Sequence, residues 1–315
     1  MLVIIIFAIM NVMKIVTAGS AYLDIDAYAG CIAEAELLRI NGEDAYAASS
    51  APLNESIPRS LRVLGIGLEE YRVGEKDEFI IVDVSKEDFF DPIVKNGTVV
   101  EVIDHHPGQE KYWQEKIGDK ADIEFIGASC TQIFERWQTD NRLQEMNPEI
   151  ARLLAAGILD NTLNFNADVT TQRDRNAYEV LKQIGGLPED FAAQYFTECQ
   201  ASIEDNFEQA VSNDIKTMEE TPKLPHSFGQ LTVWDAKAFA LDKKDLITQI
   251  LNNRDSDWAL NLISIGEGRS YFLSTSESGQ SKLKALIGSD FTEGIAEADR
   301  LWLRKELLNL ALQNL

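Results

Sequence analysis

The sequence predicts an α/β fold, in which a doubly wound, mostly parallel sheet domain is followed by a smaller mixed α+β domain. Short apolar runs such as FIIVDVS (79–85) and TVVEVID (98–104) are typical of parallel strands covered on both faces. Helical stretches alternate with these runs through the first half of the chain, which indicates strand–helix–strand units. At 315 residues the chain is long enough for two domains, each with its own core.

The first half divides into predicted strands and helices that follow one another. The strands are expected at 13–18, 79–85, 98–104 and 121–127. The helices are expected at 27–41, 129–144, 147–162 and 174–184. The stretch GGLPED (185–190) is a strong helix stop, so we place the domain boundary near residue 195 and expect domains over 13–195 and 196–315.

The second half has a mixed pattern. We expect a long helix at about 200–218, a strand at 229–236, a helix at 243–253, a hairpin over 258–276 that turns at Gly266–Gly268, and a closing segment over 296–315.

Composition limits the partners. A net charge of −23 argues against broad nucleic-acid binding, which needs a basic surface, but leaves room for a small anionic substrate that meets metal ions. Cys31, Cys130 and Cys199 are odd in number, lie far apart and form no CxxC motif, so we expect a cytoplasmic protein. The apolar residues 2–10 are too few to span a bilayer, and no membrane partner is expected. We interpret residues 1–12 as an over-extended start or an unusual strand, with a signal anchor as the minority alternative.

Carboxylates and imidazoles lie where the predicted strands end. In an open α/β sheet, ligands bind beyond the carboxyl ends of the strands, so we expect one convergent site. Crowded carboxylates cannot all stay ionised without a cation, and mixed Asp/His ligation without cysteine suits Mn²⁺, Co²⁺, Mg²⁺ or Zn²⁺. Two ions about 3.5–4 Å apart would share a bridging carboxylate and a bridging water. The candidate residues are Asp24, Asp26, Asp83, Asp104, His105, His106 and Asp160.

Ordinary structural roles compete with this interpretation. A single aspartate after a strand is commonly a cap or turn residue, and two histidines before Pro107 fit a solvated turn. Asp24 and Asp26 are two apart, so in an extended segment their side chains would point to the same side. The ordered set, with each group behind its own strand or on a helix that leads into the site, favours a metal site.

Four short motifs together resemble those of the DHH phosphoesterases, over nearly the whole chain. They are DID (24–26), VDVS (82–85), DHH (104–106) and GILDNTLNF (157–165). The stretch 157–174 is similar to the fourth motif of family II inorganic pyrophosphatases and of the related exopolyphosphatase and prune proteins. The segment LWLRKELLNLAL (301–312) resembles the arginine–lysine motif of that branch.

The resemblance implies a role for each residue. Asp24 and Asp83 would hold one ion, and the second would be held by Asp26, Asp83, His105 and Asp160, with Asp83 bridging. His106 would contact substrate phosphate, and Asp104 would orient the histidines. In the second domain, Lys216, Arg304 and Lys305 would bind substrate phosphate, and closure of that domain would exclude water.

Two positions depart from the family pattern. The pyrophosphatases have a histidine four residues before the first aspartate, where this chain has Ser20, which is either a weak ligand or a turn residue. Glu306 stands where a further lysine is common. These departures keep open a phosphate-binding regulatory protein that has lost activity. A phosphodiesterase of small nucleotides is a third alternative.

The expected activity is hydrolysis of phosphoanhydride bonds in pyrophosphate or short polyphosphate. The resemblance implies two divalent ions, with Mn²⁺ first and Co²⁺ or Mg²⁺ as alternatives. A homodimer and a small polyanionic substrate are the expected partners.

Overall fold

The computed structural model describes residues 12–74, 76–219 and 221–313, so the expectations for the N-terminal segment fall on residues 1–11, which lie outside the described residues. Its described residues form two compact units, one of 12–57 with 61–188 and the other of 58–60 with 189–313. The expected boundary at residue 195 falls inside a helix of the second unit. Among the described residues, no helix is both long and apolar enough to cross a membrane.

The N-terminal unit is built on a parallel sheet with strand order β2-β1-β3-β4-β5. This confirms the predicted doubly wound α/β domain. The strands are β1 (Met13–Thr17), β2 (Ala45–Ala47), β3 (Asp77–Val82), β4 (Thr98–Asp104) and β5 (Ala121–Ile123). Because the order reverses between β1 and β3, the carboxyl ends of these two strands open a crevice at the switch point.

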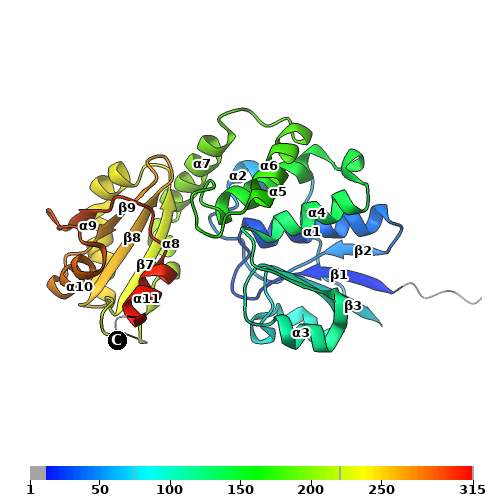
Figure 1. Cartoon of the computed structure of the whole chain (residues 1–315), viewed down its shortest axis with the longest axis horizontal. Helices are drawn as coiled ribbons and strands as arrows, with labels where there is room; N and C mark the ends of the chain where they lie inside the picture. The colour runs from blue at the N-terminus through cyan, green and yellow to red at the C-terminus, as the bar shows by residue number, and fades with distance from the viewer. Residues whose placement is uncertain (1–11, 75, 220, 314–315) are drawn as a thin grey trace, which may run out of the picture. The chain divides into compact units, whose positions relative to one another are not determined.

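Helices cover both faces of this sheet (Figure 1). Helix α3 packs its buried Trp113 against Ile15, Phe79, Ile81 and Val102 on one face. Helices α1 and α4 lie on the other face, where the alternate strand residues point, and α5 packs on these two helices. The helices of this unit are α1 (Ile25–Ile40), α3 (Glu110–Ile117), α4 (Ser129–Thr139), α5 (Pro148–Asn161) and α6 (Gln172–Ile184). The short helix α2 (Arg59–Arg62) has residues in both units.

The C-terminal unit contains a mixed sheet with strand order β10-β9-β8-β7-β6, in which only the β7–β8 pair is parallel. Apolar side chains of α7, α8 and α9 pack on one face and those of α10 and α11 on the other. The strands are β6 (Lys216–Thr217), β7 (Ser227–Val233), β8 (Trp258–Ser264), β9 (Arg269–Leu273) and β10 (Ile295–Glu297). The helices are α7 (Phe191–Asp205), α8 (Phe207–Asp214), α9 (Ala236–Arg254), α10 (Glu277–Ile287) and α11 (Arg304–Gln313).

Several predicted elements were wrong in extent. The single helix expected at about 200–218 is two helices, α7 and α8, because the chain leaves helical geometry at Asn206 (φ −125°, ψ 39°). Asparagine favours such breaks because its side chain competes for backbone hydrogen bonds. The prediction also missed β2, α2, α3, β6 and α10, and the closing segment contains a strand before its helix.

Helix α1 approaches the sheet closely at Gly30. This contact predicts that substitutions at Gly30 and Val82 have non-additive effects on stability. A Cβ atom there would lie 2.7 Å from Cγ1 of Val82, the residue before Asp83. Although alanine is the better helix former, we expect Gly30→Ala to lower the free energy of unfolding by about 1–2 kcal/mol through overpacking. Urea denaturation measures this, and the Gly30→Ala/Val82→Ala double variant should lose less than the sum of the two single losses. Additive losses would contradict the predicted clash.

Candidate metal centre

The loops that follow β1, β3 and β4 bring the predicted acidic and imidazole side chains to the switch point of the sheet. Asp83 follows β3 directly, Asp104 is the last residue of β4, and the two histidines come next. The loop after β3 is held from the other face of the sheet, because the buried Trp113 donates its indole N–H to the carbonyl oxygen of Ser85 at 2.6 Å.

Asp83 lies at the centre of the site. Its backbone has φ 64°, a left-handed conformation that is uncommon outside glycine, and its N–H donates to the carbonyl of Ile103 at 2.8 Å. Its Oδ1 lies 3.3 Å from Nε2 of His105 and accepts a hydrogen bond from the Ser129 hydroxyl at 3.2 Å. Burial, followed by the charges of Asp24 and Asp26, raises the pKa of Asp83 to about 7. A cation bound beside these crowded carboxylates would relieve their repulsion.

The two histidines are oriented differently. Nδ1 of His105 lies 3.1 Å from the carbonyl oxygen of Ile126, which directs Nε2 toward Asp83. Nδ1 of His106 lies 2.8 Å from Oδ1 of Asp104, which is fully buried. The other oxygen of Asp104 has no hydrogen-bond partner among the described residues. The His106 side chain is 61% exposed, so its Nε2 is available to a ligand from solvent.

Protonation of the two rings follows from these partners. Burial disfavours a charged His105, but the hydrogen bond and charge of Asp83 outweigh burial and raise its pKa to about 10. Burial likewise opposes a charged His106, and the bond to Asp104 raises its pKa nevertheless. Without a cation, the site therefore holds protons that a metal ion would displace.

Asp26 is fully buried and joins three helices. Its Oδ2 accepts the backbone N–H of Ser129 and its Oδ1 that of Cys130, each at 2.8 Å, at the N-terminus of α4. The side-chain amide of Asn161, at the end of α5, donates to the same Oδ2. Nε2 of His105 lies 3.9 Å from that oxygen.

The start of α1 corrects the expectation of an extended segment. Helix α1 begins at Ile25, so Asp26 lies in its first turn, while Asp24 is the N-cap and accepts the N–H of Ala27 at 3.0 Å. Burial, then the charge of Asp26, raises the pKa of Asp24. Ser20 is exposed in a bend and its backbone N–H donates to the carbonyl of Phe89.

The donor set fits a divalent ion. One donor atom each from Asp83, His105 and His106 lies within 4.8 Å of the others. His105 presents Nε2 while a carbonyl holds Nδ1, which is how ligating histidines are usually oriented. The buried thiol of Cys130 donates to the carbonyl oxygen of Asp26, and burial and then the charge of Asp26 raise its pKa well above its usual value.

Comparison with known proteins identifies the domain in the N-terminal unit. Residues 14–158 match the DHH family, N-terminal domain. The N-terminal unit contains a DHH domain. Its recognition from the DID, VDVS, DHH and GILDNTLNF motifs is thereby confirmed.

Relatives extend the likeness beyond the DHH domain. The chain is 26% identical over 260 residues to the manganese-dependent inorganic pyrophosphatase of Methanocaldococcus jannaschii, covering 76% of this chain and 80% of that protein. It is 25% identical over 238 residues to a protein of Bacillus mycoides described as a probable manganese-dependent inorganic pyrophosphatase, covering 74% and 73%.

Solved structures share the fold. A Methanococcus jannaschii protein assigned to the family II inorganic pyrophosphatases aligns with a TM-score of 0.64 and 21% identity, covering 95% of this chain and all of that one. An exopolyphosphatase-related protein from Bacteroides fragilis aligns with a TM-score of 0.52 and 11% identity, covering 96% and 91%. Both parts of the predicted architecture are therefore confirmed.

The fourth motif places an unexpected residue in the DHH site. Asp160 is the penultimate residue of α5, and its role as a ligand stays a prediction. The side-chain amide of the next residue, Asn161, donates a hydrogen bond to Oδ2 of Asp26. Ser129, the first residue of α4, was not among the predicted site residues, yet it contacts both Asp26 and Asp83. The only signal for Asn161 in the sequence was its place beside Asp160.

The basic residues expected to bind phosphate lie in the C-terminal unit, and their role stays a prediction. Lys216 is exposed on β6. Arg304 is largely buried, and its Nη1 donates to Oδ2 of Asp214 at 2.8 Å and to two backbone carbonyls. The side chain of Lys305 lies outside the described part of the structure.

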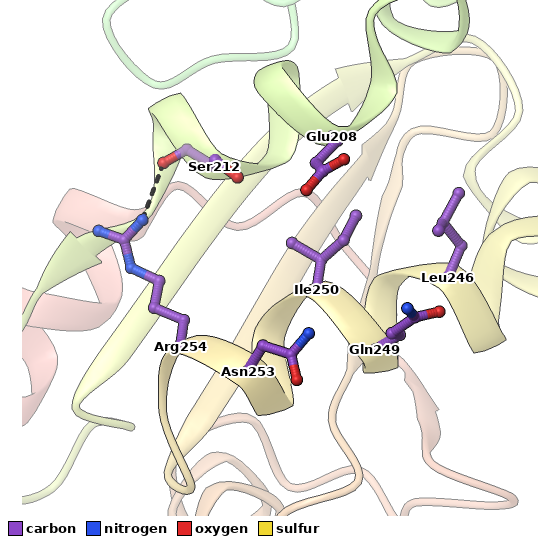
Figure 2. A pocket seen from close by; sticks show the side chains of 7 residues that line it. All are labelled: Glu208, Ser212, Leu246, Gln249, Ile250, Asn253 and Arg254. Atoms are coloured by element: carbon purple, nitrogen blue, oxygen red, sulfur yellow. Dashed lines mark hydrogen bonds between the residues drawn. The ribbon is translucent and has the colours of Figure 1, made fainter.

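The C-terminal unit also contains a hollow of about 280 Å³ between α8 and α9 (Figure 2). Glu208 and Ser212 face Ile250 and Arg254 across it, and Arg254 donates to the carbonyl of Ser212 at 3.2 Å. Its lining has no clustered titratable groups comparable with those of the DHH site, so we assign it no chemistry.

Affinity for Mn²⁺ should rise with pH. With Asp83 and His105 as the predicted ligands, binding needs an ionised Asp83 and a neutral His105. Their pKa values are raised to about 7 and about 10, so protons compete with the ion between pH 6 and 8. The dissociation constant should fall about tenfold per pH unit for each proton displaced. Calorimetry in buffers of different ionisation enthalpy measures both the affinity and the protons released. An affinity that is flat from pH 6 to 8 would rule out this proton displacement.

Proposed function

We propose that this chain is a divalent-metal-dependent hydrolase of phosphoanhydride bonds, acting on inorganic pyrophosphate or short polyphosphate. The observation that carries the proposal is the gathering of Asp83, His105 and His106 at the switch point of a DHH domain. The manganese-dependent pyrophosphatases among its relatives support Mn²⁺ as the ion and pyrophosphate as a substrate.

We propose that Asp83 and His105 are ligands of the divalent ion. Asp83 supplies a buried carboxylate, and His105 supplies an Nε2 fixed by its bond to the Ile126 carbonyl. A bound divalent ion lowers the pKa of water and withdraws charge from phosphate oxygens. A second ion at Asp24 and Asp83, with Asp26 and Asp160 completing the first position, belongs to the same proposal.

His106 supplies the contact with substrate. Asp104 accepts a hydrogen bond from Nδ1 of His106 and favours its charged form, so that Nε2–H can donate to a phosphate oxygen. This donor neutralises charge that grows on the phosphate during hydrolysis. Asp104 acts through His106 and is a positioning residue.

We propose a cytoplasmic location as well. Cys31, Cys130 and Cys199 are buried and form no disulfide within the described residues, which suits a reducing compartment.

A phosphate-release assay with Mn²⁺ tests the proposed activity. Purified protein should release phosphate from pyrophosphate, tripolyphosphate or longer chains. His106→Ala should lower kcat/KM by about 100-fold or more, because one charged donor to the phosphate is lost. Asp83→Asn should abolish turnover.

His226→Ala is the matched control for this assay. His226 is the third histidine of the chain and pairs with Asp255 in the C-terminal unit, so its loss should leave turnover near that of wild type. Absence of phosphate release from every substrate, with Mn²⁺ bound, would refute the proposed activity.

A second candidate is a regulatory protein that binds phosphate compounds without hydrolysing them. Arg304 favours it, because Asp214 already neutralises a guanidinium that the resemblance assigns to substrate. This alternative predicts saturable pyrophosphate binding with no phosphate release.

A further inference from the structure

We propose that Asn161 sets the affinity of this site for its divalent ion, by occupying the Asp26 oxygen that faces His105. The inference rests on the proposed function only because it takes Asp83 and His105 as ligands of a divalent ion. Asn161 is then a positioning residue, because it acts through Asp26.

The first step is the saturation of one carboxylate oxygen. Oδ2 of Asp26 accepts the backbone N–H of Ser129 at 2.8 Å and the side-chain amide of Asn161. A carboxylate oxygen has about two lone-pair positions, so both are used. Oδ1 is turned to the N–H of Cys130. The oxygen that lies 3.9 Å from Nε2 of His105 therefore has no free lone pair for an ion beside His105.

The second step concerns the amide itself. An ionised carboxylate only accepts, so Nδ2 of Asn161 must face Asp26. Turning the amide to offer its oxygen would set oxygen against oxygen and leave a fully buried carboxylate short of one donor. Asn161 thus contributes stability to the metal-free site, and an ion that recruits Asp26 must break this hydrogen bond.

Replacing the amide by a carboxylate reverses both effects. In Asn161→Asp, the donor to Asp26 is lost and a further anion joins Asp24, Asp26 and Asp83. Repulsion among these groups should lower the melting temperature of the metal-free protein, while a cation gains a ligand and a free Asp26 oxygen. The two changes have opposite signs, which a merely structural role for Asn161 would not produce.

The experiment measures Mn²⁺ binding and melting temperature on the full-length chain. Mn²⁺ binding is followed by the electron paramagnetic resonance signal of the free ion, and melting is recorded with and without Mn²⁺. We expect Asn161→Asp to bind Mn²⁺ at least tenfold more tightly than wild type and to melt at a lower temperature without metal. Its stabilisation by Mn²⁺ should exceed that of wild type.

The control is Asn164→Asp, three residues further along. It adds the same charge, but the hydrogen bonds of Asn164 within the described residues come from its backbone. This variant should bind Mn²⁺ within about twofold of wild type. Equal tightening in both variants would overturn the inference, since charge alone would then explain the effect.

The outcomes separate this inference from the proposed function. If wild type binds Mn²⁺ and Asn161→Asp binds it equally or more weakly, the role of Asn161 is overturned and the hydrolase proposal stands. Binding that appears only in Asn161→Asp supports the role of Asn161 while counting against a metal-dependent activity of the natural chain. Absence of Mn²⁺ binding in both proteins overturns both.

Discussion

A fully buried carboxylate at the N-terminus of a helix joins the three helices that carry the site. Asp26, from the first turn of α1, accepts two backbone N–H groups of α4 and the amide of Asn161 from α5. The helix dipole and the unpaired N–H groups of the first turn favour a negative charge there. Gly157 lets α5 come close, since a Cβ at this position would lie 3.3 Å from Cα of Asp26 and 2.5 Å from Sγ of Cys130. Because Ser129 also donates its hydroxyl to Asp83, the same contact fixes the central carboxylate of the site.

In Asp26, the structural role of joining three helices competes with the proposed role as a metal ligand. A carboxylate with three N–H donors is well satisfied in a buried place, and it has correspondingly less to offer a cation. Asp83, unlike Asp26, lies in surroundings that disfavour its negative charge. Burial and the neighbouring charges of Asp24 and Asp26 raise its pKa to about 7, and a left-handed backbone holds it in position. The site therefore contains one carboxylate, Asp83, in surroundings that favour a cation, and another, Asp26, that already accepts three hydrogen bonds from the protein.

The fold could be predicted from the sequence because the parallel strands are nearly continuous apolar runs, and β4 was placed at its observed bounds of 98–104. The acidic and imidazole residues could be found because they follow those runs. Contacts across long stretches of chain could not be read in the same way. The bond between Asn161 and Asp26 spans 135 residues, and that between Ser129 and Asp26 spans 103. An amide beside an aspartate gives no pattern in the sequence, and the three-residue strand β2 is too short for a periodic signal.

The adjacent histidines differ because their Nδ1 atoms meet different acceptors. A neutral backbone carbonyl, that of Ile126, fixes the orientation of His105 without adding charge, so the ring can serve an ion as a neutral ligand. A buried carboxylate, that of Asp104, favours a charged His106, and a charged donor suits an anionic phosphate better than it suits a cation. Because the two residues are consecutive, one strand end presents both functions a few ångströms apart, with ring centroids separated by 4.3 Å. In the proposed hydrolase, that spacing would place the exposed ring beside a phosphate that approaches an ion at Asp83 and His105, where a charged donor can stabilise the phosphate.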